Sequence, residues 1–153
     1  MILIAAIVFV LDRLMKVWAY DVLRELPGGT RALWENVLQL TYAENRGMSF
    51  GLFSGNSELI STLSIALCLF LFIVLIAARN RAPIGLRLLG WALLGGALGN
   101  LYDRLRFGFV IDMFEIRLFR FAIFNVADAF LCVSVAFVAL YILFGKPGVA
   151  QKS

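Results

Sequence analysis

The sequence predicts an all-α integral membrane protein with four transmembrane helices and a small loop and strand region on the outer face of the membrane. Of the 153 residues, 62% are apolar and only 16% are charged, and the mean hydropathy is +0.91. A soluble domain is roughly 45–50% apolar and about 25% charged, and one soluble core of this length cannot bury so much apolar surface. At roughly 20 residues per span, about four helices fit into a single membrane domain, residues 1–153.

The four helices are expected over residues 1–20, 59–78, 86–104 and 123–144. The second is the clearest because none of its residues is charged. The first is interrupted by Asp12, Arg13 and Lys16, and the third is short with a polar carboxyl end. The fourth contains a single charge and is followed by Pro147 and Gly148, which terminate helices.

The connecting segments predict the orientation of these helices. Outer loops are expected over 21–58 and 105–122, and a cytoplasmic loop over 79–85. Within the first outer loop, the alternation over 36–42 predicts a short strand. Residues 79–87 and the tail with Lys146 and Lys152 carry basic residues and no acidic one. The positive-inside rule therefore places both termini in the cytoplasm.

The residue types that are missing exclude several kinds of chemistry. The chain has no histidine, which excludes Ser-His and Cys-His catalytic pairs and His-containing zinc sites. Its two cysteines, Cys68 and Cys132, lie in apolar runs that are typical of packing residues. No cofactor and no metal site are indicated. The net charge of +4 points to lipid and topology, with no nucleic acid among the expected partners.

Ionisable side chains inside spanning helices are costly, roughly 2.5–3.5 kcal/mol each on insertion scales, and therefore suggest function. Asp12 and Lys16 are spaced i, i+4, which places them on one face of the first helix in the favourable acid-before-base order. A structural ion pair and a direct role in a site both remain open for them.

Two glycine-containing segments flank the helices at the outer side. The segment from Asn45 to Gly51 has glycines at Gly47 and Gly51 that permit a tight turn, and taken alone it is typical of an ordinary loop.

In the third helix, Gly95 and Gly99 form a small-xxx-small pair that allows close helix packing. Gly96, Asn100 and Arg104 follow one another at four-residue spacing and share a face. This shared face is compatible with helix packing alone and with a part in a functional site, and both interpretations remain open.

Asp112 and Asp128 are the acidic residues with the strongest catalytic interpretation. Asp128 lies about one turn into the fourth helix, three residues after Asn125, without a basic residue four positions away. Two neighbouring carboxyl groups share a proton because both cannot ionise. The charged member can then activate water, and the protonated member can polarise a carbonyl and protonate the leaving amine. This aspartic peptidase chemistry needs no histidine, cysteine or metal.

Five motifs in order give the chain a resemblance to a known family. They are D-R-L-M-K at 12–16, N-R-G-M-S-F-G at 45–51, G-G-A-L-G-N-L-Y-D-R at 95–104, V-I-D-M-F at 110–114 and F-N-V-A-D at 124–128. In this order, on a four-helix membrane chain, they closely resemble the bacterial lipoprotein signal peptidase (signal peptidase II) family.

The resemblance implies an endopeptidase of the cytoplasmic (inner) membrane that cleaves prolipoproteins at the outer face, before a diacylglyceryl-modified cysteine. It implies that Asp112 and Asp128 form the catalytic dyad. It further implies that globomycin-type inhibitors bind, and it assigns substrate binding or support of the site to Asp12, Lys16, Asn45, Gly47, Gly96, Asn100, Arg104, Asn125 and Ala127.

Two alternatives keep the same polar residues but give them other functions. In a proton-coupled transporter or channel subunit, Asp12, Asp112 and Asp128 would relay protons. In a non-catalytic assembly subunit, the polar seam would serve helix packing only. The absence of an internal repeat in the sequence argues against the transporter.

Overall fold

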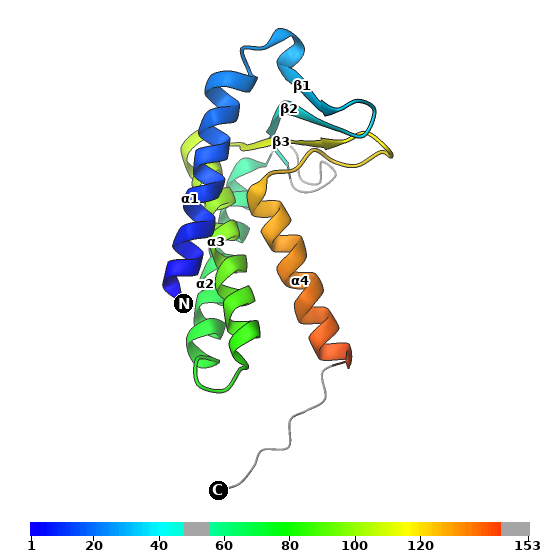
Figure 1. The fold of residues 1–153 in the computed structure, drawn as a ribbon. Helices are drawn as coiled ribbons and strands as arrows, with labels where there is room; N and C mark the ends of the chain where they lie inside the picture. Colours follow the sequence, from blue (N-terminus) through cyan, green and yellow to red (C-terminus); the bar gives the residue numbers. More distant parts are fainter. Residues whose placement is uncertain (48–55, 145–153) are drawn as a thin grey trace, which may run out of the picture.

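The structure is a computed structural model, which describes residues 1–47 and 56–144. In chain order its elements are α1 (Ile2–Trp18), a π-helical turn (Ala19–Leu23), a 3-10 turn (Pro27–Gly29), β1 (Thr30–Trp34), β2 (Leu38–Asn45), α2 (Ser57–Ala77), α3 (Ile84–Phe107), β3 (Val110–Ile116) and α4 (Val126–Phe144). Figure 1 shows the helices side by side with the sheet at one end. Met48 to Gly51 of the second motif, Pro147, Gly148 and the tail lysines lie outside the described residues.

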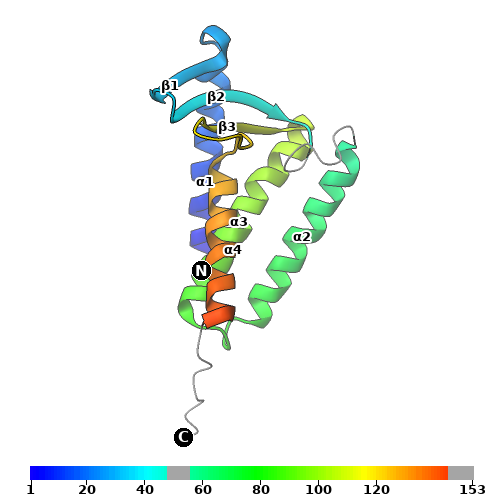
Figure 2. The same ribbon diagram turned by 90° about the vertical axis from the view of Figure 1, so that its right-hand side faces the viewer.

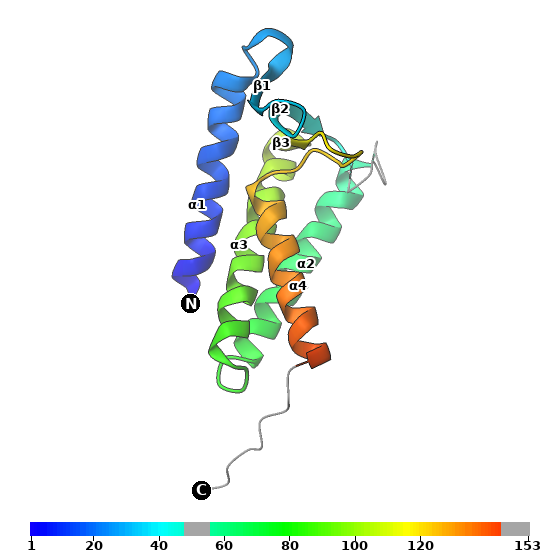
Figure 3. The same cartoon turned by 45° about the vertical axis from the view of Figure 1, so that its right-hand side comes forward.

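The third helix, α3, is the centre of the bundle. Figure 2 shows α1 and α2 on opposite sides of α3, and Figure 3 shows α4 running along it as well. Glycines on α3 allow these close approaches. A Cβ atom at Gly95 would overlap the backbone of Ala5 in α1, and one at Gly96 would lie 2.9 Å from the carbonyl oxygen of Ala127 in α4. The small residues of this helix therefore serve two neighbours on different faces.

Three helices in the described part of the chain, α2, α3 and α4, are long and apolar enough to cross a membrane. Helix α1 has 17 residues and contains the charged residues Asp12, Arg13 and Lys16. Large apolar side chains of α2 and α4 point outward, as Phe70 and Ile142 illustrate with exposed fractions of 62% and 74%. Such surfaces are suited to lipid. The protein is thus predominantly helical, with three candidate membrane helices and a small sheet.

The sheet is antiparallel with strand order β1-β2-β3. The strand expected over 36–42 is found as β2, which ends three residues later, at Asn45. Strands β1 and β3 were not predicted. Partners change from Leu40–Phe114 to Ala43–Asp112, so β2 contains one residue more than β3 between these pairs, a β-bulge. Apolar side chains of the sheet pack on the π-helical turn that follows α1, which fixes the sheet over the end of the bundle.

Candidate functional site

Asp112 and Asp128 come from different elements and meet at one asparagine. Asp112 lies in β3, and Asp128 lies in the first turn of α4. The Asn125 side chain donates a hydrogen bond from Nδ2 to Asp112 Oδ1 at 2.6 Å. The same residue accepts at Oδ1 from the Asp128 backbone N–H at 2.9 Å, and its own backbone N–H donates to Asp128 Oδ2 at 3.2 Å. Asn125 therefore ties both carboxyl groups together.

This arrangement differs from the helical i, i+3 pair that the sequence predicts for Asn125 and Asp128. Helix α4 begins at Val126, so Asn125 precedes the helix and caps it. The two residues form a reciprocal capping box, because each side chain accepts the backbone N–H of the other. Asp128 thus has a capping role in addition to any chemical one.

Two further asparagines complete the hydrogen bonds to the aspartates. Asn100 of α3 donates from Nδ2 to Asp128 Oδ1 at 2.8 Å and accepts at Oδ1 from Asn125 at 3.1 Å. Asn45, at the end of β2, donates to Asp112 Oδ2 at 3.0 Å. Both oxygens of each carboxyl group therefore receive a neutral N–H donor, which holds the two groups in fixed orientations.

The surroundings of Asp112 favour its protonated form. Burial, followed by the negative charge of Asp128, raises the pKa of the Asp112 carboxyl to about 7, against the opposing hydrogen bonds from Asn45 and Asn125. The Asp112 side chain is only 2% exposed. Near neutral pH the pair is therefore able to hold a single proton, which is the state that general acid and base catalysis by two carboxyl groups requires.

A buried network of ion pairs between α1 and α3 supports the asparagines. Lys16 Nζ lies 2.9 Å from Asp12 Oδ2 and 3.0 Å from Asp103 Oδ2, and it donates to Asn100 Oδ1 at 2.7 Å. Lys16, Asp12 and Asp103 are all inaccessible to solvent. Arg13 also pairs with Asp103, so two cations balance two anions in a region where an unpaired charge is costly.

The two acids of this network hold the segments that carry the catalytic candidates. Asp12 Oδ1 accepts the backbone N–H of Ala127 at 2.9 Å, one residue before Asp128. Asp103 Oδ2 accepts the backbone N–H of Ile111 at 3.2 Å, one residue before Asp112. Asp103 and Arg13 are not among the site residues that the sequence predicts. The three-residue spacing of Asp103 from Asn100, which places both on one helix face, was the available signal.

The remaining predicted site residues border the same cluster. Gly47 is buried, and its backbone N–H donates to Asn45 Oδ1 at 3.1 Å. Arg104 of α3 reaches the Gly47 carbonyl oxygen at a long 3.5 Å. Gly96 packs under Ala127, as described above. The structure thus brings all eleven predicted site residues into one region, directly or through a single intermediate contact.

Two cavities open from this region into the helical bundle. One of about 410 Å³ lies between α2, α3 and α4, and another of about 530 Å³ extends from the site along α4 and the segment before it. Asn100, Arg104 and Asp128 line both cavities, and most of the other lining side chains are apolar. Within residues 1–47 and 56–144, no group of His, Cys, Asp and Glu side chains could hold a metal ion.

Known proteins resemble this chain over nearly its whole length. Residues 4–144 match the family model for Signal peptidase (SPase) II. A lipoprotein signal peptidase of Clostridioides difficile (strain 630) is 38% identical over 143 residues, 94% of each chain. Another, of Lactococcus lactis subsp. lactis, is 40% identical over 143 residues, 92% of this chain and 90% of the relative.

Solved structures agree with these relatives. One, described as a bacterial membrane enzyme, superposes with a TM-score of 0.82 at 25% identity, covering 99% of this chain and 92% of the other. None of these similarities supports the transporter alternative. The family model, the sequence relatives and the fold lead to the same result: this chain belongs to the signal peptidase II family.

Proposed function

We propose that this protein is an aspartic endopeptidase that removes the signal peptide from diacylglyceryl-modified prolipoproteins, cleaving before the lipidated cysteine. Family membership and the relatives' name, lipoprotein signal peptidase, support the substrate class. The observation that carries the chemistry is the linkage of Asp112 and Asp128 through Asn125, beside a largely apolar cavity that Asp128 lines. A lipidated substrate needs such a cavity, because its acyl chains remain in apolar surroundings.

In the proposed reaction the two aspartates have different roles. Asp128 faces the cavities and accepts a proton from the attacking water. Asp112, whose pKa is raised to about 7, holds the shared proton and polarises the scissile carbonyl. As the intermediate collapses, Asp112 gives this proton to the leaving amine, and the pair keeps the proton that Asp128 took from water. Asn45, Asn100 and Asn125 hold the carboxyl groups in orientation, so that little reorganisation is needed during the reaction.

The remaining predicted residues have supporting roles in this proposal. Asp12 and Lys16 brace the site from α1, and Gly96 permits the close approach of Ala127. Arg104 lines both cavities and reaches the Gly47 carbonyl oxygen, and we assign substrate contact to both residues. Globomycin-type inhibitors are expected to occupy the same cavity. The basis for that last expectation is the family resemblance.

We further propose a four-span arrangement in the bacterial cytoplasmic (inner) membrane, with one membrane domain, both termini cytoplasmic and the active site toward the outer face. Helix α1, with 17 residues, is about 25 Å long, which is close to the minimum for a span. It runs beside α3, and its amino end lies at the same end of the bundle as the loop after α2 (Figure 1). That loop contains Arg79 and Arg81 and no acidic residue, which supports a cytoplasmic position.

Cleavage of a lipidated prolipoprotein by purified variants in detergent tests the proposed function. Asp112→Asn and Asp128→Asn are each expected to abolish cleavage while the protein keeps its helical circular dichroism and its monodisperse elution. Asp21→Asn, at an exposed acid of the π-helical turn, is the matched control and should cleave normally. Full turnover by either Asp112→Asn or Asp128→Asn would refute the assignment. A substrate without the diacylglyceryl group should remain uncut, and its equally rapid cleavage would refute the substrate class.

A further inference from the structure

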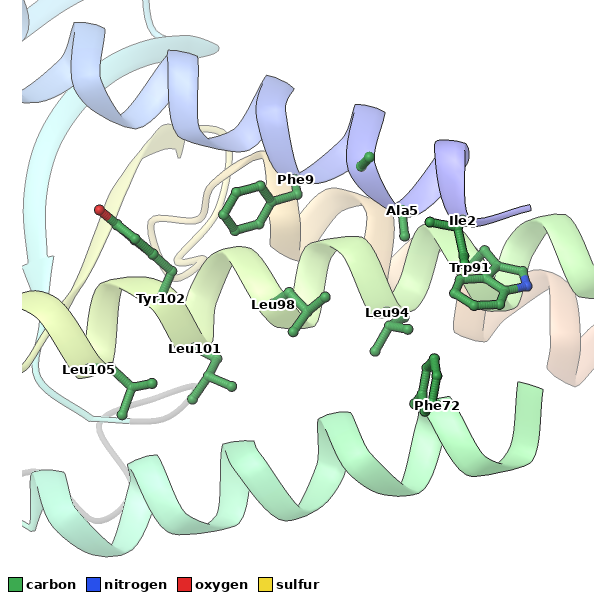
Figure 4. Close-up of a pocket in the computed structure, with 11 residues that line it drawn as sticks. Ile2, Ala5, Phe9, Phe72, Trp91, Leu94, Leu98, Leu101, Tyr102 and Leu105 are labelled. Atoms are coloured by element: carbon green, nitrogen blue, oxygen red, sulfur yellow. The ribbon is translucent and has the colours of Figure 1, made fainter. Parts of the chain in front are cut away.

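An apolar groove lies on the face of the bundle away from the aspartates. It has a volume of about 560 Å³ and is bounded by α1 and α2, with α3 as its floor. Figure 4 shows Ile2, Ala5 and Phe9 of α1 opposite Phe72 of α2, with a row of α3 side chains between them. The floor residues are Trp91, Leu94, Leu98, Leu101, Tyr102 and Leu105. None of the proposed site residues lines this groove.

We infer that this groove binds one acyl chain of an anionic phospholipid from the leaflet on the sheet side of the membrane. Its lining is almost entirely apolar, so a hydrocarbon chain is its chemical complement. From Trp91 to Leu105 the floor extends over fourteen residues of helix, about 21 Å. The hydrocarbon of one leaflet is about 15 Å thick, half of a bilayer core of about 30 Å. The groove is therefore long enough to follow one acyl chain through the hydrocarbon of a single leaflet, with its sheet end reaching the head groups.

The two ends of the groove differ in a way that selects the leaflet. At the end away from the sheet, Trp91 and Leu94 are buried with exposed fractions of 7% and 4%, and Trp91 packs edge-on against Phe72. At the sheet end, Tyr102 and Leu105 are 44% and 62% exposed. A chain therefore enters from the sheet end, and its far end packs against the buried Trp91 and Leu94.

The charges at the open end favour an anionic head group. Arg106 is exposed, lies one helical turn after Tyr102, and makes no ion pair within residues 1–47 and 56–144. The guanidinium of Arg13 stacks on the Tyr102 ring at 4.6 Å and is partly exposed. The acid beside this end, Asp103, is fully buried and already paired. A phosphate at this position thus meets Arg106, unpaired within the described part of the chain, beside Arg13, whose charge Asp103 balances.

Native mass spectrometry of the full chain, with phosphatidylglycerol added to the delipidated protein, tests the inference. One phosphatidylglycerol is expected to be retained per chain. Ala6→Trp, which fills the groove from α1, should abolish retention. Ala66→Trp, at an exposed alanine of α2 outside the groove, should leave it unchanged. Equal retention by the two tryptophan variants would overturn the proposal.

The head-group contribution is tested with two arginines at the same end of the molecule. Arg106→Gln should weaken phosphatidylglycerol binding about fivefold, whereas Arg31→Gln, at an exposed arginine of β1, should not. Equal binding of phosphatidylcholine and phosphatidylglycerol by the unmodified protein would overturn the anionic specificity. A wild-type dimer that Ala6→Trp dissociates would instead identify the groove as an interface between copies of this chain and would also overturn the proposal.

A measurement on the unmodified protein covers the case in which Ala6→Trp does not fold. Phosphatidylglycerol with a photoactivatable acyl chain should label the peptide that contains residues 91–105. Labelling confined to α4 would refute the placement. All of these readouts measure bound lipid, so they succeed or fail independently of prolipoprotein cleavage.

Discussion

The contact between Gly96 and Ala127 makes a quantitative prediction about the site. A Cβ atom at Gly96 would lie 2.9 Å from the Ala127 carbonyl oxygen and 3.3 Å from its Cα atom. Since both are backbone atoms, a Gly96→Ala substitution must move α4 away from α3 by about 0.5 Å to restore an ordinary van der Waals contact of about 3.4 Å. Asp128 follows Ala127 directly, so this movement displaces a proposed catalytic group.

The expected losses of stability and of turnover follow from the overpacking at Gly96 and from the displacement of Asp128. Overpacking costs about 1–3 kcal/mol, against which the better helix propensity of alanine offsets up to about 1 kcal/mol. A misplacement of 1 Å costs a catalytic site about a hundredfold in rate, so a shift of half that size should lower kcat about tenfold. Gly85→Ala, in the same helix with nothing within 4 Å of the added atom, is the matched control and should be neutral or slightly stabilising.

Thermal unfolding in detergent and cleavage of a lipidated prolipoprotein measure the two effects. We expect Gly96→Ala to unfold at a lower temperature than Gly85→Ala and to turn over about ten times more slowly. If both alanine variants matched the wild type in unfolding temperature and turnover, the close approach of α3 and α4 would not position Asp128, and the reasoning would be refuted.

Four other predictions concern charge and hydrogen bonding in the site. Because Asp112 must be protonated and its pKa is about 7, kcat/KM should fall about tenfold per pH unit above pH ~7, and a flat profile up to pH 9 would contradict the proposed proton holder. The same raised pKa means that the folded state binds more protons than the unfolded state between about pH 4 and 7, so the free energy of unfolding should decrease over this range and increase in Asp112→Asn at neutral pH. Lys16→Met leaves Asp12 without its cation and should cost about 3–5 kcal/mol in denaturant unfolding, unless the site takes up a proton, which the pH dependence of unfolding would show. Asn125→Ala should lose about 1 kcal/mol as a missing helix cap but nearly all cleavage, and high residual turnover would show that the bridge between the carboxyl groups is dispensable.

The sequence predicts the polar cluster well because local spacing determines much of it. The four-residue spacing of Asp12 and Lys16 becomes a buried ion pair, and the spacing of Gly96, Asn100 and Arg104 becomes the helix face that meets α4 and the cavities. Helical periodicity is a local property, so it can be read without knowledge of the partner.

The features of the fold and site that the sequence does not predict depend on partners distant in the chain. Strand β3 has four consecutive buried residues, Val110 to Met113, and therefore lacks the alternation of a half-exposed strand. Its hydrogen-bonding partner, β2, lies more than sixty residues earlier in the chain. Asp103 looks like a polar residue at a helix end until α1 places Arg13 and Lys16 against it. Periodicity within one segment contains no information about such contacts.

The bulge in β2 determines which side chain faces Asp112. With the extra residue, Ala43 pairs with Asp112 and Asn45 with Val110, so the Asn45 amide lies on the side of the sheet where it donates to Asp112. A regular ladder continued from the Leu40–Phe114 pair would place Glu44 at the position of Asn45. A carboxylate would then replace the amide, and three acids would crowd a site that accommodates two. A one-residue slip would leave the fold recognisable, but it would remove an amide donor from Asp112 and add a third acid that competes for the proton of the pair. The bulge therefore determines whether an amide or an acid faces Asp112.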